Sequence, residues 1–197
     1  MLLLRSTECI QELPNQGITT VSEKSPWIAV YTKSRHEKRV AQSLGQRGFD
    51  CYLPLLPAVS RWHDRKRTVW WPLFPGYLFA RLTPSNLSAL HAVPGVVSVV
   101  SVAGVPATIP NAEIENVRRL AEAIALTGSG PKPAVLVTEG ESIEVAKGPF
   151  RGVQGRVVEH RGDRITLNVG VSAIGQGVRL EVAEECVRSI ADHSRSA

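Results

Sequence analysis

The chain has 197 residues, of which 43% are hydrophobic and 21% are charged, and its formal net charge is +5. This length and apolar content predict a globular protein with one medium domain or two small ones, and no window approaches the length of a membrane span. The three cysteines stand far apart without CxxC spacing, which argues against a disulfide framework and a zinc site. We therefore expect a protein of a reducing cytoplasm, and the positive charge favours an anionic partner.

The first 26 residues predict a leader that precedes the fold. The apolar run 1–4 meets Arg5 at once and lacks the small-residue cleavage site of a signal peptide. We expect residues 1–26 to be disordered. The β-branched and aromatic run WIAVYTK, at 27–33, predicts the first strand.

A helix is predicted directly after this strand. Ser34 and Glu37 have the spacing of a capping box, in which each side chain satisfies a free backbone donor at the helix start. The helix should continue to about Arg47 and stop at Gly48. Its inward residues are expected to be Val40, Ala41 and Leu44.

Four β runs are expected next. CYLPLLP, at 51–57, predicts a proline-bounded strand, and the runs between 59 and 71 flank HDRKR, which predicts a hairpin with a basic tip. PLFPGYLFARL, at 72–82, begins with two prolines that cannot donate to a sheet ladder and then alternates as a strand. Tyr77 and Phe79 should share one face of this strand.

The first domain is predicted to end with a long helix. SNLSALHAV predicts a short helix, VVSVVSV a strand, and Asn111 has the character of an N-cap residue. The apolar positions after it recur at helical spacing and predict one buried face: Ile114, Val117, Leu120, Ala121 and Ile124. Residues 27–126 therefore predict one α+β domain with helices packed on a sheet.

A second, all-β domain is predicted beyond a linker. Residues 127–136 begin with the Gly, Ser and Pro composition of a linker, and residues 137–190 hold short β runs separated by glycine-bearing turns. Residues 27–126 contain 12 Lys and Arg against 6 Asp and Glu, whereas residues 135–190 contain 7 against 8. We therefore expect the first domain to be the part that binds an anionic partner.

No motif of an enzyme or a metal site is present. The sequence lacks a nucleophile elbow, a phosphate loop, HExxH and a dinucleotide fingerprint, and its five histidines lack ligand spacing. The glycines of KGPFRGVQG, at 147–155, fail the phosphate-loop spacing, so we expect them to form turns between strands. We expect no catalysis and no cofactor.

Basic residues gather at two places in the first domain, with tryptophans between those of the second. Such a surface suits phosphate contacts and base stacking, and the alternative is an ordinary solvated basic face. The first group, at the strand–helix junction, is Lys33, Arg35, Lys38 and Arg39, and the second, at the hairpin, is Arg61, Arg65, Lys66 and Arg67.

The ordered set of motifs resembles the NusG family of transcription elongation factors. WIAVYTK, the helix ending in RGFDCYLPLL, the basic hairpin, PLFPGYLF, VPGVVSVV and NAEIENVRRLAE match its amino-terminal (NGN) domain, and VAKGPFRGVQGRVV matches its KOW domain. The match covers about residues 27–190. It implies an antiparallel NGN sheet with packed helices, followed by a small SH3-like KOW barrel.

The resemblance also implies partners and site residues. NGN domains bind the clamp helices of the largest catalytic subunit of RNA polymerase through an apolar, aromatic pocket, which reduces pausing. The matching residues are Tyr31, Phe74, Tyr77 and Phe79, for which core packing is the alternative role. Members that read the non-template DNA strand of the bubble do so at positions that correspond to Lys33, Arg35 and Arg39, with Arg65, Lys66 and Arg67 as a second set.

Some residues depart from the general family pattern. Where the general factor carries an aromatic residue that contacts the termination factor Rho or a protein of the small ribosomal subunit, this chain has Ile174. Ser34 stands where general factors tend to have proline. These departures favour a specialised paralogue of the RfaH or UpxY type, which promotes read-through of particular operons. The alternatives are the general factor and a structural RNA-binding protein of ribosomal type.

Overall fold

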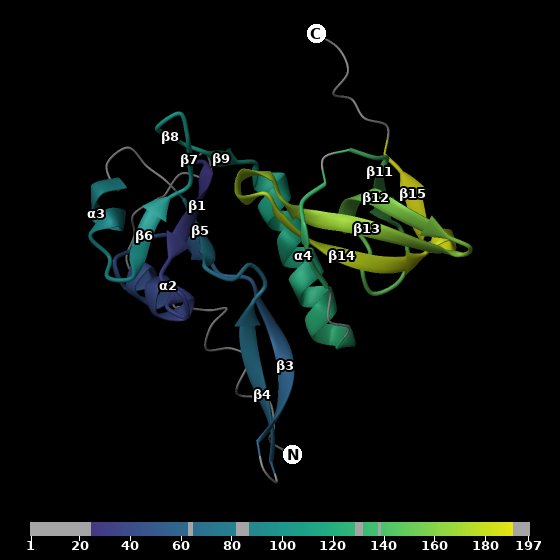
Figure 1. The fold of residues 1–197 in the computed structure, drawn as a ribbon, viewed down its shortest axis with the longest axis horizontal. Helices are drawn as coiled ribbons and strands as arrows, with labels where there is room; N and C mark the ends of the chain where they lie inside the picture. Colours follow the sequence, from purple (N-terminus) through teal and green to yellow (C-terminus); the bar gives the residue numbers. More distant parts are fainter. Residues whose placement is uncertain (1–24, 63–64, 82–86, 129–131, 138, 191–197) are drawn as a thin grey trace.

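The computed structural model describes residues 25–62, 65–81, 87–128, 132–137 and 139–190 (Figure 1). The side chains of residues 59–67 also lie outside the description, as does nearly all of the range 1–26 expected as a leader.

The first half of the chain is built on an antiparallel sheet. Its strand order is β2-β5-β1-β6, and β9 also pairs with β1. In the central pair, Tyr31 lies opposite Tyr77 and Ala29 opposite Phe79, so these four residues share one face of the sheet. The strands are β1 (Trp27–Thr32), β2 (Cys51–Tyr52), β5 (Tyr77–Arg81), β6 (Val96–Val99) and β9 (Thr108–Ile109).

One face of this sheet, called the α2 face, is covered by two helices that follow or precede its strands closely in sequence. They are α2 (Glu37–Gln46) and the short α3 (Leu87–His91). The predicted inward residues of α2 pack there, with Val40 and Leu44 fully buried and Ala41 partly buried. The strands contribute alternate residues to the same cluster: Ile28, Val30, Leu78, Ala80 and Val99.

The predicted capping box is wrong. Helix α2 begins at Glu37, and its N-cap residue is His36, whose side chain makes no capping hydrogen bond. Ser34 lies two residues before the cap. The Glu37 carboxylate instead accepts a hydrogen bond from the Gly76 N–H, because the helix start faces the turn before β5.

The opposite face, called the α4 face, is covered by the long helix α4 (Asn111–Thr127). All five predicted inward residues of α4 are buried. Asn111 is the first helical residue, not the N-cap as predicted, which is Pro110. The Asn111 side chain accepts a hydrogen bond from Trp27 Nε1 at 2.9 Å and so ties the helix start to β1.

Two hairpins extend from the sheet. The predicted basic hairpin is confirmed as β3 (Leu55–Trp62) paired with β4 (Arg65–Pro72), and Figure 1 shows it projecting beside α4. The run expected as one strand at 51–57 is divided between β2 and the start of β3. A small hairpin, β7 (Ser101–Val102) with β8 (Val105–Pro106), follows β6.

The second half of the chain is all-β, as predicted. Its six strands form one antiparallel sheet in the order β10-β14-β13-β12-β11-β15. A 3-10 turn, η1 (Ser172–Ile174), joins β13 to β14, and η2 (Glu184–Cys186) precedes β15. The strands are β10 (Lys132–Val135), β11 (Ser142–Val145), β12 (Gln154–Arg161), β13 (Arg164–Val171), β14 (Gln176–Ala183) and β15 (Val187–Ser189).

The glycines of 147–155 do not all play the predicted role. Gly148 and Gly152 have φ of +84° and +83° and lie in turns, as expected. Gly155 lies inside β12. A Cβ there would stand 2.9 Å from the carbonyl oxygen of Asn168 on β13, so glycine is needed for the close approach of two strands. Strand β10 falls in the range expected as a linker, and the domain division stays a prediction.

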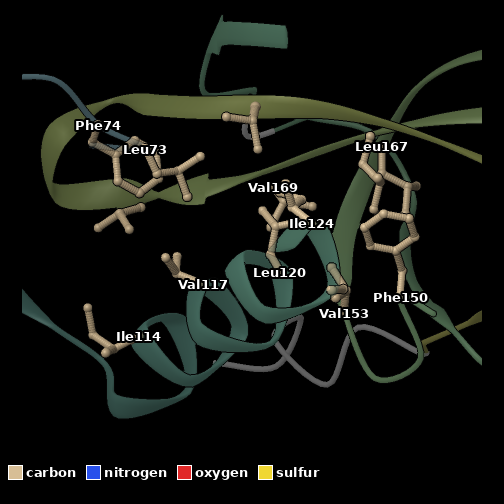
Figure 2. Packing of buried hydrophobic residues seen from close by; sticks show 14 of the residues in the cluster. Leu73, Phe74, Ile114, Val117, Leu120, Ile124, Phe150, Val153, Leu167 and Val169 are labelled. Carbon is tan, nitrogen blue, oxygen red and sulfur yellow. The ribbon is translucent and has the colours of Figure 1, made fainter. Parts of the chain in front are cut away.

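The second sheet packs against α4. One buried cluster runs from the α4 face of the first sheet, through the apolar stripe of the helix, to the inner residues of β13. Figure 2 shows Leu120 and Ile124 of α4 close to Val169, and Val153 and Phe150 beside them. Helix α4 therefore lies between the two sheets.

Candidate functional site

The aromatic turn before β5 divides into buried and exposed rings. Phe74 and Phe79 are only 1% and 0% exposed, and their rings meet edge to face with centroids 6.0 Å apart. They belong to the cluster on the α4 face. In this structure both rings are core, which was the alternative role considered from the sequence.

Tyr31 and Tyr77 form a more accessible aromatic pair, called the tyrosine pair. They lie opposite each other on β1 and β5, with ring centroids 5.2 Å apart. Tyr31 is 41% exposed, and Tyr77 is half-buried at the rim of the apolar cluster. The predicted polymerase-binding residues therefore include two rings that are at least partly exposed and two that are buried in the core.

The backbone beneath the tyrosine pair is fixed at Gly76. This residue has φ of +83°, and a Cβ on it would lie 3.1 Å from the Tyr31 ring, so glycine allows the ring to rest on the turn. Its carbonyl accepts from the Thr32 N–H at 2.8 Å, and its N–H donates to the Glu37 carboxylate at 2.8 Å. The backbone of Gly76 is thus held by β1 through its carbonyl and by α2 through its N–H.

The tip of the second sheet reaches the first sheet on its α4 face. Turn η1 lies against β1 and β9, and Ala173 and Ile174 pack on the cluster of the α4 face. The Glu113 carboxylate on α4 accepts hydrogen bonds from the Ser172 N–H at 3.0 Å and from its hydroxyl at 2.8 Å. Ile174, expected as a partner-binding residue, therefore lies in the contact between the two halves of the chain.

Two further polar contacts hold the second sheet on α4. The Asn116 side chain pairs with the backbone of Gln154, donating to its carbonyl and accepting from its N–H, both at 2.7 Å. Arg119 donates to the Gly152 carbonyl at 3.3 Å. The apolar stripe of α4 is thus flanked by a row of polar anchors.

Arginines stack on the aromatic residues at the other side of α4. The Arg81 guanidinium lies 4.6 Å from the Trp27 ring centroid and forms an ion pair with Asp50 at 2.8 Å. Arg118 lies 4.2 Å from the Tyr52 ring. Burial raises the pKa of the Tyr52 hydroxyl, and the Arg118 charge opposes part of that rise. The Arg118 stack attaches α4 to the sheet, whereas the Arg81 stack joins β5 to β1, and neither involves the tyrosine pair.

The basic residues of the strand–helix junction are exposed. Lys33, Arg35 and Arg39 surround the start of α2, and Lys38 is exposed beside them. Arg35 has φ of +62°, a left-handed conformation that is strained for a residue with a side chain. Of the second predicted set, the backbones of Arg65, Lys66 and Arg67 lie in β4, and their side chains fall outside the described part of the chain.

Sequence reasoning missed the residues that fix the turn. Thr32 and Glu37 are buried polar side chains, and both hydrogen-bond to Gly76. The available signal was the polar Thr32 at the end of an apolar strand and the acidic Glu37 five residues later. Within the described ranges, no three His, Cys, Asp or Glu side chains come together as metal ligands would, and no helix is both long and apolar enough to cross a bilayer.

Comparisons with known proteins agree with the motifs. The family model described as "Transcription termination factor nusG" matches residues 25–118. The NusG protein of Pseudomonas aeruginosa is 28% identical over 169 residues, which are 79% of this chain and 93% of that protein. The NusG protein of Rickettsia bellii is 27% identical over 179 residues, covering 84% and 92%. Both are named transcription termination/antitermination proteins.

A solved structure described as "Domain interaction in Thermotoga maritima NusG" matches 85% of this chain and 98% of its own, with 22% identity and a TM-score of 0.49. The matched family model spans the first sheet, both of its basic groups and the aromatic turn. The relatives extend the match over most of the second sheet as well. Residues 25–118 match the NusG family model, and the chain is similar to transcription termination/antitermination proteins of that name over about four fifths of its length.

Proposed function

We propose that this protein is a transcription elongation and antitermination factor that binds the clamp helices of RNA polymerase, suppresses pausing and promotes read-through of particular operons. The observation that carries the proposal is the tyrosine pair, which stands accessible at the rim of a buried aromatic cluster. Exposed aromatic rings on a rigid support are typical binding hot spots, because they bury much area and lose little conformational freedom.

The second half of the chain competes for the same surface in this proposal. Turn η1 contacts β1 and β9, and its residues Ala173 and Ile174 pack on the buried cluster of the α4 face, the face that also carries the tyrosine pair. A helical hairpin that covered the whole α4 face at this end would have to displace η1. The free energy of polymerase binding is then reduced by the free energy of that contact.

The exposed basic residues of the strand–helix junction support a nucleic-acid partner. Lys33, Arg35 and Arg39 are clustered and exposed, which suits phosphates of the non-template DNA strand in the transcription bubble. The hairpin residues Arg65, Lys66 and Arg67 form the second proposed set. Such contacts supply affinity and salt dependence more than sequence specificity.

The experiment is a binding titration of the purified protein with core RNA polymerase. The double variant Tyr31→Ala, Tyr77→Ala should bind on the order of tenfold more weakly or worse while remaining folded, because both rings lie at the proposed contact. Trp71→Ala is the matched control, since its ring is 54% exposed on the β3–β4 hairpin and outside the pair. Absence of binding by the folded wild type would overturn the proposal.

The alternative within the same family is the general factor, which couples polymerase to Rho and to a protein of the small ribosomal subunit through the KOW domain. It is favoured by relatives of the general type that match 79% and 84% of the chain. The aliphatic Ile174 favours the specialised paralogue of RfaH or UpxY type. Rho binding at micromolar protein, abolished by Ile174→Asp, would decide for the general factor. A structural RNA-binding protein of ribosomal type would instead bind RNA and leave polymerase unbound.

A further inference from the structure

We propose that Glu37 is a positioning residue for the tyrosine pair: its buried carboxylate holds the Gly76 backbone, and the Gly76 turn in turn supports the Tyr31 ring. The inference rests on the proposed function for its consequence in binding, and on the structure alone for the positioning itself.

Glu37 is unusual for its burial. It is 6% exposed, and among the residues that the structure describes it is the one acidic side chain that is buried. A buried carboxylate is costly unless hydrogen bonds replace its water. Its position as the first residue of α2 lowers that cost, because the free N–H groups and the dipole of a helix start favour negative charge.

The hydrogen bond of this carboxylate points to one place. Glu37 Oε1 accepts from the Gly76 N–H at 2.8 Å, across 39 residues of sequence and in a buried environment. A bond from a backbone N–H to a charged acceptor is stronger than a neutral one. The Gly76 carbonyl is held separately by Thr32, whose N–H donates at 2.8 Å. The Gly76 residue is therefore clamped from α2 on one side and from β1 on the other.

The clamped residue bears directly on the rings. A Cβ on Gly76 would stand 3.1 Å from Cε2 of Tyr31, so the ring rests almost on the backbone. Tyr77 is the next residue in the chain, and its ring lies 5.2 Å from that of Tyr31. A shift of the Gly76 backbone therefore moves Tyr77 and removes the surface on which the Tyr31 ring packs.

The loss of Glu37 leaves the Gly76 N–H buried without an acceptor, and the turn is expected to move until that N–H reaches water. Glu37→Gln keeps a carbonyl oxygen at the same place and should preserve most of the geometry. Glu37→Ala removes the acceptor. Val40→Ala is the matched control, because Val40 is fully buried one turn later on the same helix and its loss destabilises without touching Gly76.

The first measurement is nuclear magnetic resonance of the full chain, which needs no partner. In Glu37→Ala, we expect an upfield shift of the Gly76 amide proton and a loss of cross-peaks between the two tyrosine rings. Glu37→Gln should retain the cross-peaks, and Val40→Ala should retain both signals. Unchanged ring contacts in folded Glu37→Ala would overturn the positioning role.

The second measurement is affinity for a peptide hairpin of the polymerase clamp helices, at a temperature where every variant is folded. Glu37→Ala should bind about tenfold more weakly than Val40→Ala, and Glu37→Gln should lie between Glu37→Ala and wild type. Equal affinity of Glu37→Ala and Val40→Ala would overturn the inference for binding. If the wild type fails to bind at all, the proposed function fails, and the resonance measurement still decides the positioning.

Discussion

The two faces of the first sheet are closed in different ways. The α2 face is covered by helices that lie next to its strands in sequence, and the residues at the centre of its cluster, such as Leu44 and Leu78, are fully buried. The α4 face is covered by α4 and, at one end, by turn η1 from the second sheet. Only the α4 face keeps an accessible aromatic pair at its rim. A face closed by its own neighbours acts as core, whereas a face closed by a distant segment can exchange that segment for a partner.

The difference between the two faces can be tested most directly by truncating one side chain on each and measuring the loss of stability. Leu44→Ala removes a fully buried side chain from the α2 face and should lower the free energy of unfolding by about 3 to 4 kcal/mol. Tyr31→Ala on the rim of the α4 face should cost less than about 1 to 2 kcal/mol, because the ring is already 41% exposed. Urea denaturation measures both, and equal losses would show that the faces do not differ.

The stability of the protein at alkaline pH tests how well the α2 face excludes water. Burial, with the nearby Asp50 charge, raises the pKa of the Cys51 thiol from 9.0 to about 11, and the thiol contacts the Ala41 carbonyl at 3.5 Å. The unfolded chain loses this proton first, so stability should fall as pH rises from about 9 to about 11, by at most about 3 kcal/mol. Cys51→Ala should have a shallower decline over the same range. If the stability of the wild type and of Cys51→Ala fell equally with pH, the Cys51 thiol would not be shielded from water.

The contact that closes the α4 face can be weakened from α4 itself. Asn116→Ala removes two 2.7 Å hydrogen bonds to the Gln154 backbone and should weaken the docking of the second sheet by about 1 to 2 kcal/mol. Amide hydrogen exchange in η1 should then accelerate, and polymerase affinity should rise. Glu122→Ala, on an exposed position of the same helix, is the control. Unchanged exchange in Asn116→Ala would mean that the apolar stripe alone holds the contact.

The loop between β1 and α2 carries the smallest expected effect. Arg35→Gly relieves the left-handed strain at φ of +62° and should raise stability by about 0.5 to 1 kcal/mol, after the larger unfolded-state entropy of glycine is subtracted. The same change should weaken single-stranded DNA binding and reduce its salt dependence by about one phosphate contact. Arg39→Ala should weaken DNA binding without the gain in stability. A loss of stability in Arg35→Gly would show that the side chain makes structural contacts.

Local patterns in the sequence predicted most of the elements because periodicity is a local property. The inward residues of α4 and the basic hairpin were predicted correctly, since each depends on residues within one segment. The capping box failed for a non-local reason: Glu37 has two possible uses at a helix start, and the Gly76 N–H, 39 residues away, supplies the better one.

The candidate site could be predicted only in part for the same reason. Alternation along PLFPGYLF places Tyr77 and Phe79 on one face, and the register with β1 adds Tyr31 to that face. Whether each ring is core or contact depends on the distant segments that complete the buried cluster, in which Phe79 is fully buried while Tyr31 stays 41% exposed. These segments are distant in sequence, and local sequence patterns do not predict where they pack.

Helix α4 has one further consequence, which concerns sequence change over time. Its residues Leu120 and Ile124 lie in one buried cluster with side chains of both sheets, and Figure 2 shows them beside Val169 of the second sheet. A replacement at either position must fit two packing partners at once, so the set of tolerated residues is the overlap of what each sheet would accept alone. The two halves of the chain are therefore unable to drift independently at this helix, and changes in one sheet would be answered by compensating changes in the other.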